Sequence, residues 1–263
     1  MTNKNDVFDR AINNFKYVSS KRAYHYEQKF RYLPFWLSES SYIFKKEANN
    51  QLNKPYPYFK RGAVIRVNFG VNEGSEFSNI HFAVVLDKRD SPRKRTLTVV
   101  PLTSKNGTNR FSLGKEIFNQ TLSFLNKQFD SMKLMQKELI TKRENLNNAL
   151  LDLREQTWLD DNGIIHVKDN KEFKVQNDKT DKQHDSFMAI QNKFTKEFFK
   201  LQKVTDMYQT YNKNSFVRLT DITTISKLRI HKINNYDPSG NICLTSQQMK
   251  AISDELMKLY ISK

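Results

Sequence analysis

The chain has little cysteine: Cys243 is the only one in 263 residues. One thiol cannot form an intramolecular disulfide or supply a cysteine-rich zinc site. The sequence contains neither GxxxxGK[ST] nor GxGxxG, the two common phosphate-binding loops. Four of the five histidines share no metal-ligand spacing with one another or with carboxylates. These four are His25, His166, His184 and His231. The sequence therefore predicts no metal and no cofactor.

Long apolar runs are also missing. No stretch approaches the roughly 18 apolar residues of a membrane span, and the first residues, MTNKNDVFDR, lack the apolar run of a signal peptide. We therefore expect a cytoplasmic protein with no membrane association. Only 38% of residues are hydrophobic and the mean hydropathy is −0.73. These values favour one compact core with long solvated appendages over a single large globule.

Negative charge is scarce relative to positive charge. There are 44 lysines and arginines against 28 aspartates and glutamates, which gives a net charge of +16 and a pI near 9.7. Such an excess predicts attraction to a polyanion, namely RNA, DNA or an acidic protein. The alternative is a highly charged protein from an organism rich in Lys and Asn codons.

Residues 1–54 are predicted to be a helical segment. Apolar residues recur at helical spacing from Val7 to Val18, Pro34 interrupts the pattern, and a second helix is expected to start near Ser38. Between the two, cations alternate with aromatic rings, a pattern that suits single-stranded nucleic acid. The alternative is that they pack a helix onto the main domain. The residues are Lys21, Arg22, Tyr24, Tyr26, Lys29, Phe30, Arg31 and Tyr32.

Residues 55–118 and 213–263 are predicted to form one strand-rich core. Short apolar runs predict strands, and a helix with its apolar residues on one face is expected to begin near Ser246. The predicted strands cover residues 63–69, 82–86, 97–100, 215–219 and 222–225. Strands this short and apolar favour an α+β domain built on a small, SH3-like β-barrel with a C-terminal helix.

Residues 119–212 are predicted to be an inserted helical arm. Two heptad-like series of apolar residues, 122–153 and 187–211, indicate two long coiled-coil-like helices. The turn signal Asp161-Asn162-Gly163 lies between them, so an antiparallel hairpin is the simplest fold. Long insertions of this kind are tolerated because closure entropy grows slowly with length. The apolar stripe is interpreted as the seam of the hairpin, with an exposed partner groove as the alternative.

The stretch from Lys60 to Ser104 contains the candidate site. Glu76 lies in a glycine-bracketed polar loop, His81 opens an apolar strand, and Thr103 follows another strand. These proton-handling and hydrogen-bonding groups are therefore expected at the ends of neighbouring strands. In a strongly basic chain, this combination is what a site acting on a phosphodiester needs.

An ordered series of motifs in the two core blocks resembles the MazF/PemK family of toxin endoribonucleases. Any one of them alone would be weak, and together they cover roughly 100 residues. They are Lys60-Arg61-Gly62, Phe69-Gly70, Gly74-Ser75-Glu76, Ala83-Val84-Val85-Leu86, Val99-Val100-Pro101-Leu102-Thr103-Ser104, Asn214-Ser215-Phe216-Val217 and Thr224-Ile225-Ser226-Lys227-Leu228-Arg229-Ile230.

The resemblance implies a MazF-type β-barrel, usually a homodimer, that cuts single-stranded RNA at short sequences without a metal. It also implies a cognate antitoxin protein that blocks the site. The position of His81 is typically an arginine in that family. Histidine can donate a proton near neutral pH, but it lacks the bidentate, permanently charged grip of a guanidinium on phosphate.

Roles follow for the three candidate catalytic residues. Metal-free RNA cleavage needs a base for the 2′-OH, an acid for the departing 5′-oxygen, and donors for the phosphorane oxygens. Glu76 is the candidate base, unless it only orders its loop. His81 is the candidate acid, unless it only caps a strand end. Thr103 matches a family position near the scissile phosphate and is the candidate hydroxyl donor.

Further residues are candidates for contacts with RNA. Ser75, Ser104 and Lys105 are expected to touch the phosphate directly, and Arg61 to be structural or to bind a backbone phosphate. A basic loop between two core strands is read as RNA-binding, with a solvated turn around Pro92 as the alternative. Its cations are Arg89, Arg93, Lys94 and Arg95.

Three functional hypotheses therefore compete. The first is a sequence-selective, metal-independent endoribonuclease. The second is a catalytically weak or inactive barrel that binds nucleic acid, or binds a host protein through the arm. In the third, the arm or the N-terminal helices cover the site as a built-in antitoxin. This last hypothesis is disfavoured because both segments read as basic, whereas segments that mimic RNA are usually acidic.

Overall fold

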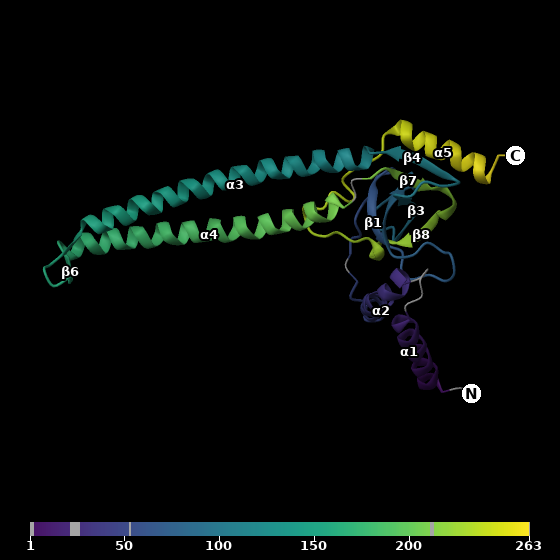
Figure 1. Ribbon diagram of the computed structural model, residues 1–263, viewed down its shortest axis with the longest axis horizontal. Helices are drawn as coiled ribbons and strands as arrows, with labels where there is room; N and C mark the ends of the chain where they lie inside the picture. The colour runs from purple at the N-terminus through teal and green to yellow at the C-terminus, as the bar shows by residue number, and fades with distance from the viewer. Residues whose placement is uncertain (1–2, 22–26, 53, 211–212, 263) are drawn as a thin grey trace. The chain divides into compact units, whose positions relative to one another are not determined.

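The computed structural model describes residues 3–21, 27–52, 54–210 and 213–262 (Figure 1). Two compact units divide the chain. The strand unit comprises Met1–Thr121, Asn212–Lys232 and Asp237–Lys263, and the arm unit comprises Leu122–Tyr211 with Ile233–Tyr236. The N-terminal segment thus belongs to the same unit as the strands, and we describe each unit by itself.

The strand unit contains an antiparallel sheet in the order β1-β2-β3-β7-β4, with β8 paired to β3. The five predicted strands are present, and β4 was not predicted because its sequence, RFSLG, has no continuous apolar run. Their bounds are Val64–Asn68 for β1, Ile80–Val85 for β2, Thr96–Thr103 for β3, Arg110–Gly114 for β4, Ser215–Arg218 for β7 and Thr223–Ser226 for β8.

The mixed α+β class is confirmed, and the sheet has open ends. Within the described ranges, no strand pairing joins β1 to β4. The outer edge of β1 instead meets a later segment through the Val67–Ile230 bridge. The His231 N–H also donates to the Arg66 carbonyl at 2.9 Å. Irregular backbone therefore satisfies an edge that a further strand would cover in a closed barrel.

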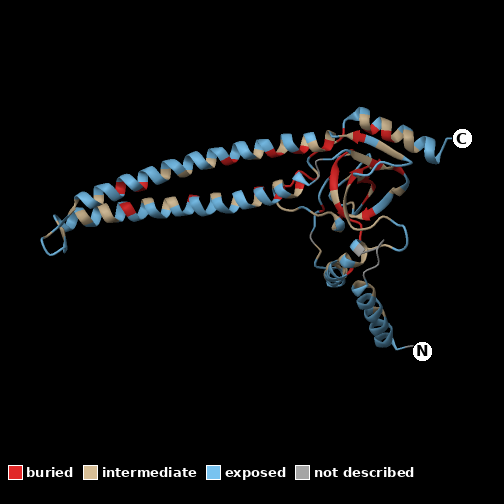
Figure 2. Cartoon of the chain, in the orientation of Figure 1, coloured by how far each residue is buried: buried red, intermediate tan, exposed pale blue. Residues whose placement is uncertain are grey.

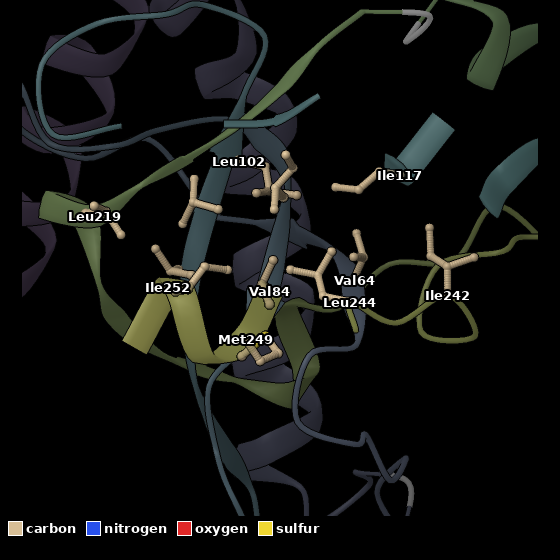
Figure 3. Packing of buried hydrophobic residues seen from close by; sticks show 12 residues of the cluster. Val64, Val84, Leu102, Ile117, Leu219, Ile242, Leu244, Met249 and Ile252 are labelled. Atoms are coloured by element: carbon tan, nitrogen blue, oxygen red, sulfur yellow. The ribbon is translucent and has the colours of Figure 1, made fainter. Parts of the chain in front are cut away.

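Both faces of the sheet bury apolar side chains, because successive residues of a strand point to opposite faces. Val64, Val84 and Leu102 pack with Met249 and Ile252 of α5, which spans Ser246–Tyr260 (Figure 3). The intervening residues form a second cluster, to which Phe59 and Ile225 also belong. It includes Ile65, Val67, Ala83, Val85, Leu97 and Val99. Figure 2 shows the buried residues concentrated in these strands.

The C-terminal helix confirms the prediction from its sequence. The Thr245 hydroxyl accepts from the Gln248 N–H while the Gln248 side chain accepts from the Thr245 N–H, which completes a capping box. A short 3₁₀ turn, Leu219–Asp221, lies between β7 and β8, and a second, Lys227–Arg229, follows β8.

The N-terminal segment forms α1, Lys4–Ser20, and α2, Glu27–Ala48. The prediction that a second helix starts near Ser38 was wrong, because α2 runs through Pro34 without a break. A proline inside a helix costs about 3 kcal/mol. Packing offsets this cost, since Leu33 is buried and the Tyr32 hydroxyl is hydrogen-bonded to Asn68 of β1.

The packing alternative for the aromatic and basic segment therefore holds for Tyr32, whose hydroxyl accepts from Asn68 Nδ2 at 2.9 Å. Arg22, Tyr24 and Tyr26 of the same segment lie outside the described residues, as does His25.

The arm unit contains two long antiparallel helices, α3 (Glu116–Glu155, which starts in the strand unit) and α4 (Asn170–Gln209), as predicted (Figure 1). Thr180 Oγ1 and Gln176 Nε2 both donate to the Ala149 carbonyl, at 3.1 and 3.3 Å. A hairpin of β5 (Thr157–Leu159) and β6 (Ile165–Val167) joins the helices. Its turn is closed by the Asp160 carboxylate, which accepts from two backbone N–H groups.

Part of the apolar stripe forms the seam between α3 and α4. Leu125, Met132, Leu146, Ile190, Leu201, Val204 and Tyr208 are buried. Other members of the stripe remain exposed, namely Leu122, Phe129 and Leu150. Tyr211, the last residue of the predicted series, lies outside the described residues. The seam interpretation therefore accounts for some positions of the stripe and not for all of them.

Candidate functional site

His81 and Thr103 lie at the same end of the sheet. His81 is near the start of β2 and Thr103 ends β3, and these two strands are antiparallel neighbours. Their last paired residues are Ala83 and Pro101, so the same register continued by two residues sets His81 opposite Thr103. Directly opposed residues share one face of a sheet. Both positions fall on the face that carries Ala83 and Val99.

Phe77 connects the loop before β2 to His81. Its ring centroid lies 4.5 Å from that of His81, and it meets the Phe69 ring edge-on at 5.1 Å. Both contacts lie in the range preferred by aromatic pairs. Phe77 is therefore an apolar platform beside the imidazole, and it comes from the loop that also holds Ser75 and Glu76.

Arg218, at the end of β7, brings a cation to the same place. Its guanidinium carbon lies 4.8 Å from the Phe77 centroid, and its Nε donates to the Asp221 carboxylate. β7 pairs with β3 so that Phe216 is opposite Thr103. Because Phe216 and Arg218 are two residues apart, they point to one face, shared with Thr103. Phe77 thus has His81 on one side and a guanidinium within cation–π distance.

Sequence reasoning missed Arg218. The motif that carries the resemblance in this region ends at Val217, one residue earlier, and a single arginine does not stand out among 44 cations. The available signal was its position directly after a short apolar strand, as for Thr103. Only the pairing of β7 with β3 shows that Arg218 lies on the same face as Thr103, two residues along from its partner Phe216.

The surroundings of His81 favour the neutral imidazole. Burial lowers the pKa of His81 below its ordinary 6.5, and the positive charge of Arg218 lowers it further. A hydrogen bond with the backbone of Ser78 acts in the opposite direction but is outweighed. At neutral pH the ring is therefore mostly unprotonated, and it is better suited to accept a proton than to donate one.

Glu76 and Ser75 are exposed on the loop between β1 and β2. The Glu76 N–H donates to the Glu73 carbonyl at 3.1 Å, and the Glu76 carbonyl accepts from the Ser78 hydroxyl at 3.2 Å. These backbone contacts order the loop. Among the interactions of the described residues, none joins the Glu76 carboxylate to His81 or Thr103.

Ser104 and Lys105 follow Thr103 in an exposed turn. The Lys105 N–H donates to Thr103 Oγ1 at 3.2 Å. Arg110 Nη1 donates to the carbonyls of Lys105 and Asn106, at 2.5 and 2.8 Å. The turn is therefore held in place next to Thr103, while the Ser104 and Lys105 side chains are exposed.

Arg61 is occupied at the opposite end of the sheet. Its Nη1 donates to the Leu86 carbonyl, and its Nη2 donates to the Ser253 hydroxyl at 2.8 Å. These bonds tie the end of β2 to α5. The structural interpretation of Arg61 agrees with this geometry.

The basic loop also lies at the far end of the β2–β3 hairpin. His81 is four residues before the end of β2, so at about 3.3 Å per residue the loop begins about 13 Å from His81 along the strand. Lys94 is engaged with Asp87 at 2.5 Å. Arg89, Arg93 and Arg95 are exposed. RNA binding by this loop stays a prediction, as a contact remote from the candidate site.

Within the described part of the chain, no group of three or more His, Cys, Asp or Glu residues could hold a metal ion. The other described histidines each lie beside a single carboxylate. His166 is 2.9 Å from Asp160, His184 is 3.6 Å from Asp185, and His231 is 2.8 Å from Glu39.

The positive charge is concentrated in the strand unit. This unit has 29 Lys and Arg against 14 Asp and Glu, whereas the arm unit has 15 against 14. The reading of the arm as basic was therefore wrong. A polyanion would be attracted to the unit that contains His81, Thr103 and Arg218.

Comparison with known protein families matches one part of the chain. Residues 60–144 match the family model described as PemK-like, MazF-like toxin of type II toxin-antitoxin system. Residues 60–144 therefore belong to the PemK/MazF family. The matched part of the PemK/MazF domain begins just before β1 and includes Glu76, His81 and Thr103. It ends inside α3, so α2 and Arg218 lie outside it.

A search of curated proteins found no match to the chain. Of the helices that the structure describes, none is both long and apolar enough to cross a membrane. Membership of a type II toxin family implies an RNA substrate and an antitoxin partner.

Proposed function

We propose that the chain is a toxin-type, metal-independent endoribonuclease that cuts single-stranded RNA by attack of the 2′-OH on the neighbouring phosphate. The observation that carries this proposal is the meeting of His81, Thr103 and Arg218 on one face at one end of the sheet. They supply a proton acceptor, a hydroxyl donor and a fixed positive charge, in the unit that holds nearly all of the excess positive charge.

In the proposed mechanism His81 acts as the general base. Its lowered pKa keeps the imidazole neutral at physiological pH, so it can take the proton of the 2′-OH. This role differs from the acid role expected from sequence, because both burial and Arg218 disfavour the protonated ring. The departing 5′-oxygen then takes its proton from solvent.

Arg218 and Thr103 act on the charge that develops at phosphorus. A guanidinium stabilises the phosphorane oxygens and replaces the arginine that the family typically has at the position of His81. The Thr103 hydroxyl donates to one of these oxygens. Ser75, Ser104 and Lys105 contact the flanking phosphates from the two exposed turns beside the site. Glu76 is the second candidate for the base, and its carboxylate would have to approach the substrate from the loop.

The proposal includes action in the cytoplasm, a homodimeric form, and an antitoxin that blocks the site; the match to a type II toxin family supports the antitoxin. The active form tested should therefore be the full chain without any antitoxin. Its oligomeric state is measured by light scattering before the cleavage assay.

The test is incubation of the pure full chain with long RNA in excess EDTA. We expect short products with 2′,3′-cyclic phosphate ends, and strongly reduced cutting by His81→Ala and Thr103→Ala. Undiminished cutting by both variants would show that the site is elsewhere. Absence of any cutting by the unmodified chain would refute the nuclease proposal.

One observation favours the alternative function, a binding protein that uses the arm. Trp158, Leu159, Ile164 and Ile165 at the β5–β6 tip are all more than half exposed. The near-neutral arm unit is poorly suited to RNA, so a protein is its expected partner. A Trp158→Ser, Ile165→Ser double variant separates the two functions. If the protein is a nuclease, the double variant should cut RNA at the same rate as the unmodified chain. If it is an arm-dependent binder, neither protein should cut RNA, and only the unmodified chain should affect cell growth.

A further inference from the structure

Helix α2 touches the loop between β1 and β2 directly. Lys29 Nζ donates to the Gly74 carbonyl at 3.2 Å. Gly70, at the start of the loop, has φ +87°, and a Cβ placed there would lie 2.7 Å from Trp36 Nε1. A side chain at Gly70 would therefore be strained by its backbone and would collide with the helix. The helix and the beginning of the loop are therefore packed too closely for any side chain at residue 70.

A buried asparagine connects α2 to the loop through hydrogen bonds. Asn68 ends β1, and its Nδ2 donates to Glu39 Oε2 at 2.8 Å and to the Tyr32 hydroxyl at 2.9 Å. Its Oδ1 accepts from the Gly70 N–H at 2.9 Å. An amide has donors on one side and an acceptor on the other. Two acceptors on α2 therefore orient the amide, and the amide then holds Gly70.

Glu39 also lies close to a third segment. Its Oε1 lies 2.8 Å from His231 Nε2, and the His231 N–H is bonded to β1. The carboxylate thus lies between α2, β1 and the segment that borders β1.

The loop is braced so that its two ends cannot shift independently. The Asn72 side chain donates to the carbonyls of Phe69 and Phe77, at 3.2 and 2.7 Å. The Asn79 N–H donates to the Gly70 carbonyl at 2.7 Å. Phe77, near the far end, contacts His81 and Arg218. A continuous set of contacts therefore leads from α2, through Gly70 and Gly74, to the residues of the candidate site.

We infer that α2 completes the catalytic site, with Glu39 and Lys29 as positioning residues for the loop of residues 70–79. The inference rests on the proposed function and deepens it, because it assigns control of that site to a helix before the family-matched region, which begins at residue 60. Neither side chain touches the substrate. Each acts by holding Phe77, Ser75 and Glu76 where His81 and Arg218 need them.

The test compares charge-matched variants on the same helix. Lys29→Met and Glu39→Ala remove the contacts with the loop and with Asn68. Lys45→Met and Glu47→Ala make the same charge changes at exposed positions. Hydrogen exchange of the amides of residues 70–79, thermal unfolding, and the kcat and KM of RNA cutting are measured for all four variants.

Glu39→Ala is expected to lower kcat by about 100-fold, because small misplacements of catalytic groups have effects of that size. Lys29→Met is expected to lower kcat by about tenfold, in line with a lost hydrogen bond from a charged donor. Both should speed exchange in the loop and leave KM within about threefold, because loop position governs the chemical step and not RNA capture. The two control variants should change neither quantity.

Glu39→Gln distinguishes positioning from electrostatics. Its amide oxygen still accepts from Asn68 Nδ2, so it should restore most of the kcat that Glu39→Ala loses. Unchanged loop exchange and unchanged kcat in Lys29→Met and Glu39→Ala would overturn the inference, as would a glutamine variant no better than alanine. If the unmodified chain cuts no RNA, the proposed function fails, and loop exchange alone still decides whether α2 holds the loop.

Discussion

The guanidinium carbon of Arg218 lies 4.8 Å from the centroid of the Phe77 ring. The centroid of the same ring is 4.5 Å from that of His81, so one aromatic side chain contacts both the imidazole and a guanidinium. The resemblance to the family leads one to expect an arginine at residue 81. In this chain the guanidinium comes instead from the end of β7, and the histidine beside it keeps a lowered pKa. The division of roles proposed above follows from this arrangement.

Removing the guanidinium should impair cleavage severely. We predict that Arg218→Met lowers kcat by about 100- to 1,000-fold, the range found when a donor to a transition-state oxyanion is lost. Arg218→Lys should recover only part of this, because an ammonium lacks the two-pronged geometry. Lys88→Met, which removes one exposed charge from the far loop, is the control and should leave kcat unchanged. An equal loss of kcat in Arg218→Met and Lys88→Met would show that the effect comes from the total charge of the protein and not from the position of Arg218.

The pH dependence of cleavage should report the state of His81. Because the neutral ring is the active form, activity should fall as the pH drops through the pKa of His81, which lies below 6.5. Arg218 lowers that pKa, so Arg218→Met should raise it and move the acid limb of the kcat/KM profile to higher pH. Titration of the imidazole by NMR gives the pKa directly. An acid limb that persists in His81→Gln would assign it to another group, with Glu76 the first to test.

Thr103→Val tests the hydroxyl with little change in shape. Loss of a hydrogen bond to a developing charge should lower kcat by about tenfold or more. Thr96→Val, at the exposed start of the same strand, is the matched control and should cut normally. A Thr103→Val enzyme with full activity would remove Thr103 from the mechanism.

Stability should depend strongly on a buried ion pair away from the site. The side chains of Lys227 and Asp90 are both fully buried and 2.7 Å apart. Lys227 also donates to the carbonyls of Pro57 and Ser91. Lys227→Met leaves Asp90 without its cation, and we expect a loss of about 3–5 kcal/mol in the free energy of unfolding. Lys227→Met with Asp90→Leu should lose less than the two single variants together, which denaturant titration can measure.

The same pair predicts how acid affects stability. Burial raises the pKa of Asp90, but hydrogen bonds from Lys227 and from the N–H groups of Phe59 and Ser91 outweigh it and hold the pKa below 3.8. A carboxylate with a lowered folded-state pKa stabilises the protein above its unfolded value. That contribution should be lost as the pH falls below about 3.8 through the folded value. The Asp90→Leu, Lys227→Met variant should lack this part of the acid dependence.

Local patterns in the sequence were sufficient to predict much of the secondary structure. The strands of residues 64–68 and 80–85, the long arm helices and the capped helix after Thr245 follow from apolar periodicity and end signals, which depend on neighbours a few residues away. Helix α2 was divided wrongly at Pro34, because the contacts that offset the proline come from β1, more than 30 residues away.

By itself the sequence determined the family resemblance, the excess of positive charge, and the presence of an imidazole and a hydroxyl at strand ends. Only the tertiary structure decided that Arg218 joins them, that the basic loop is remote, and that Glu39 and Lys29 reach the loop. The physical reason is that each of these facts depends on which strand edges pair and which helix face packs. Such pairings are set by burial and hydrogen bonding between segments far apart in the chain.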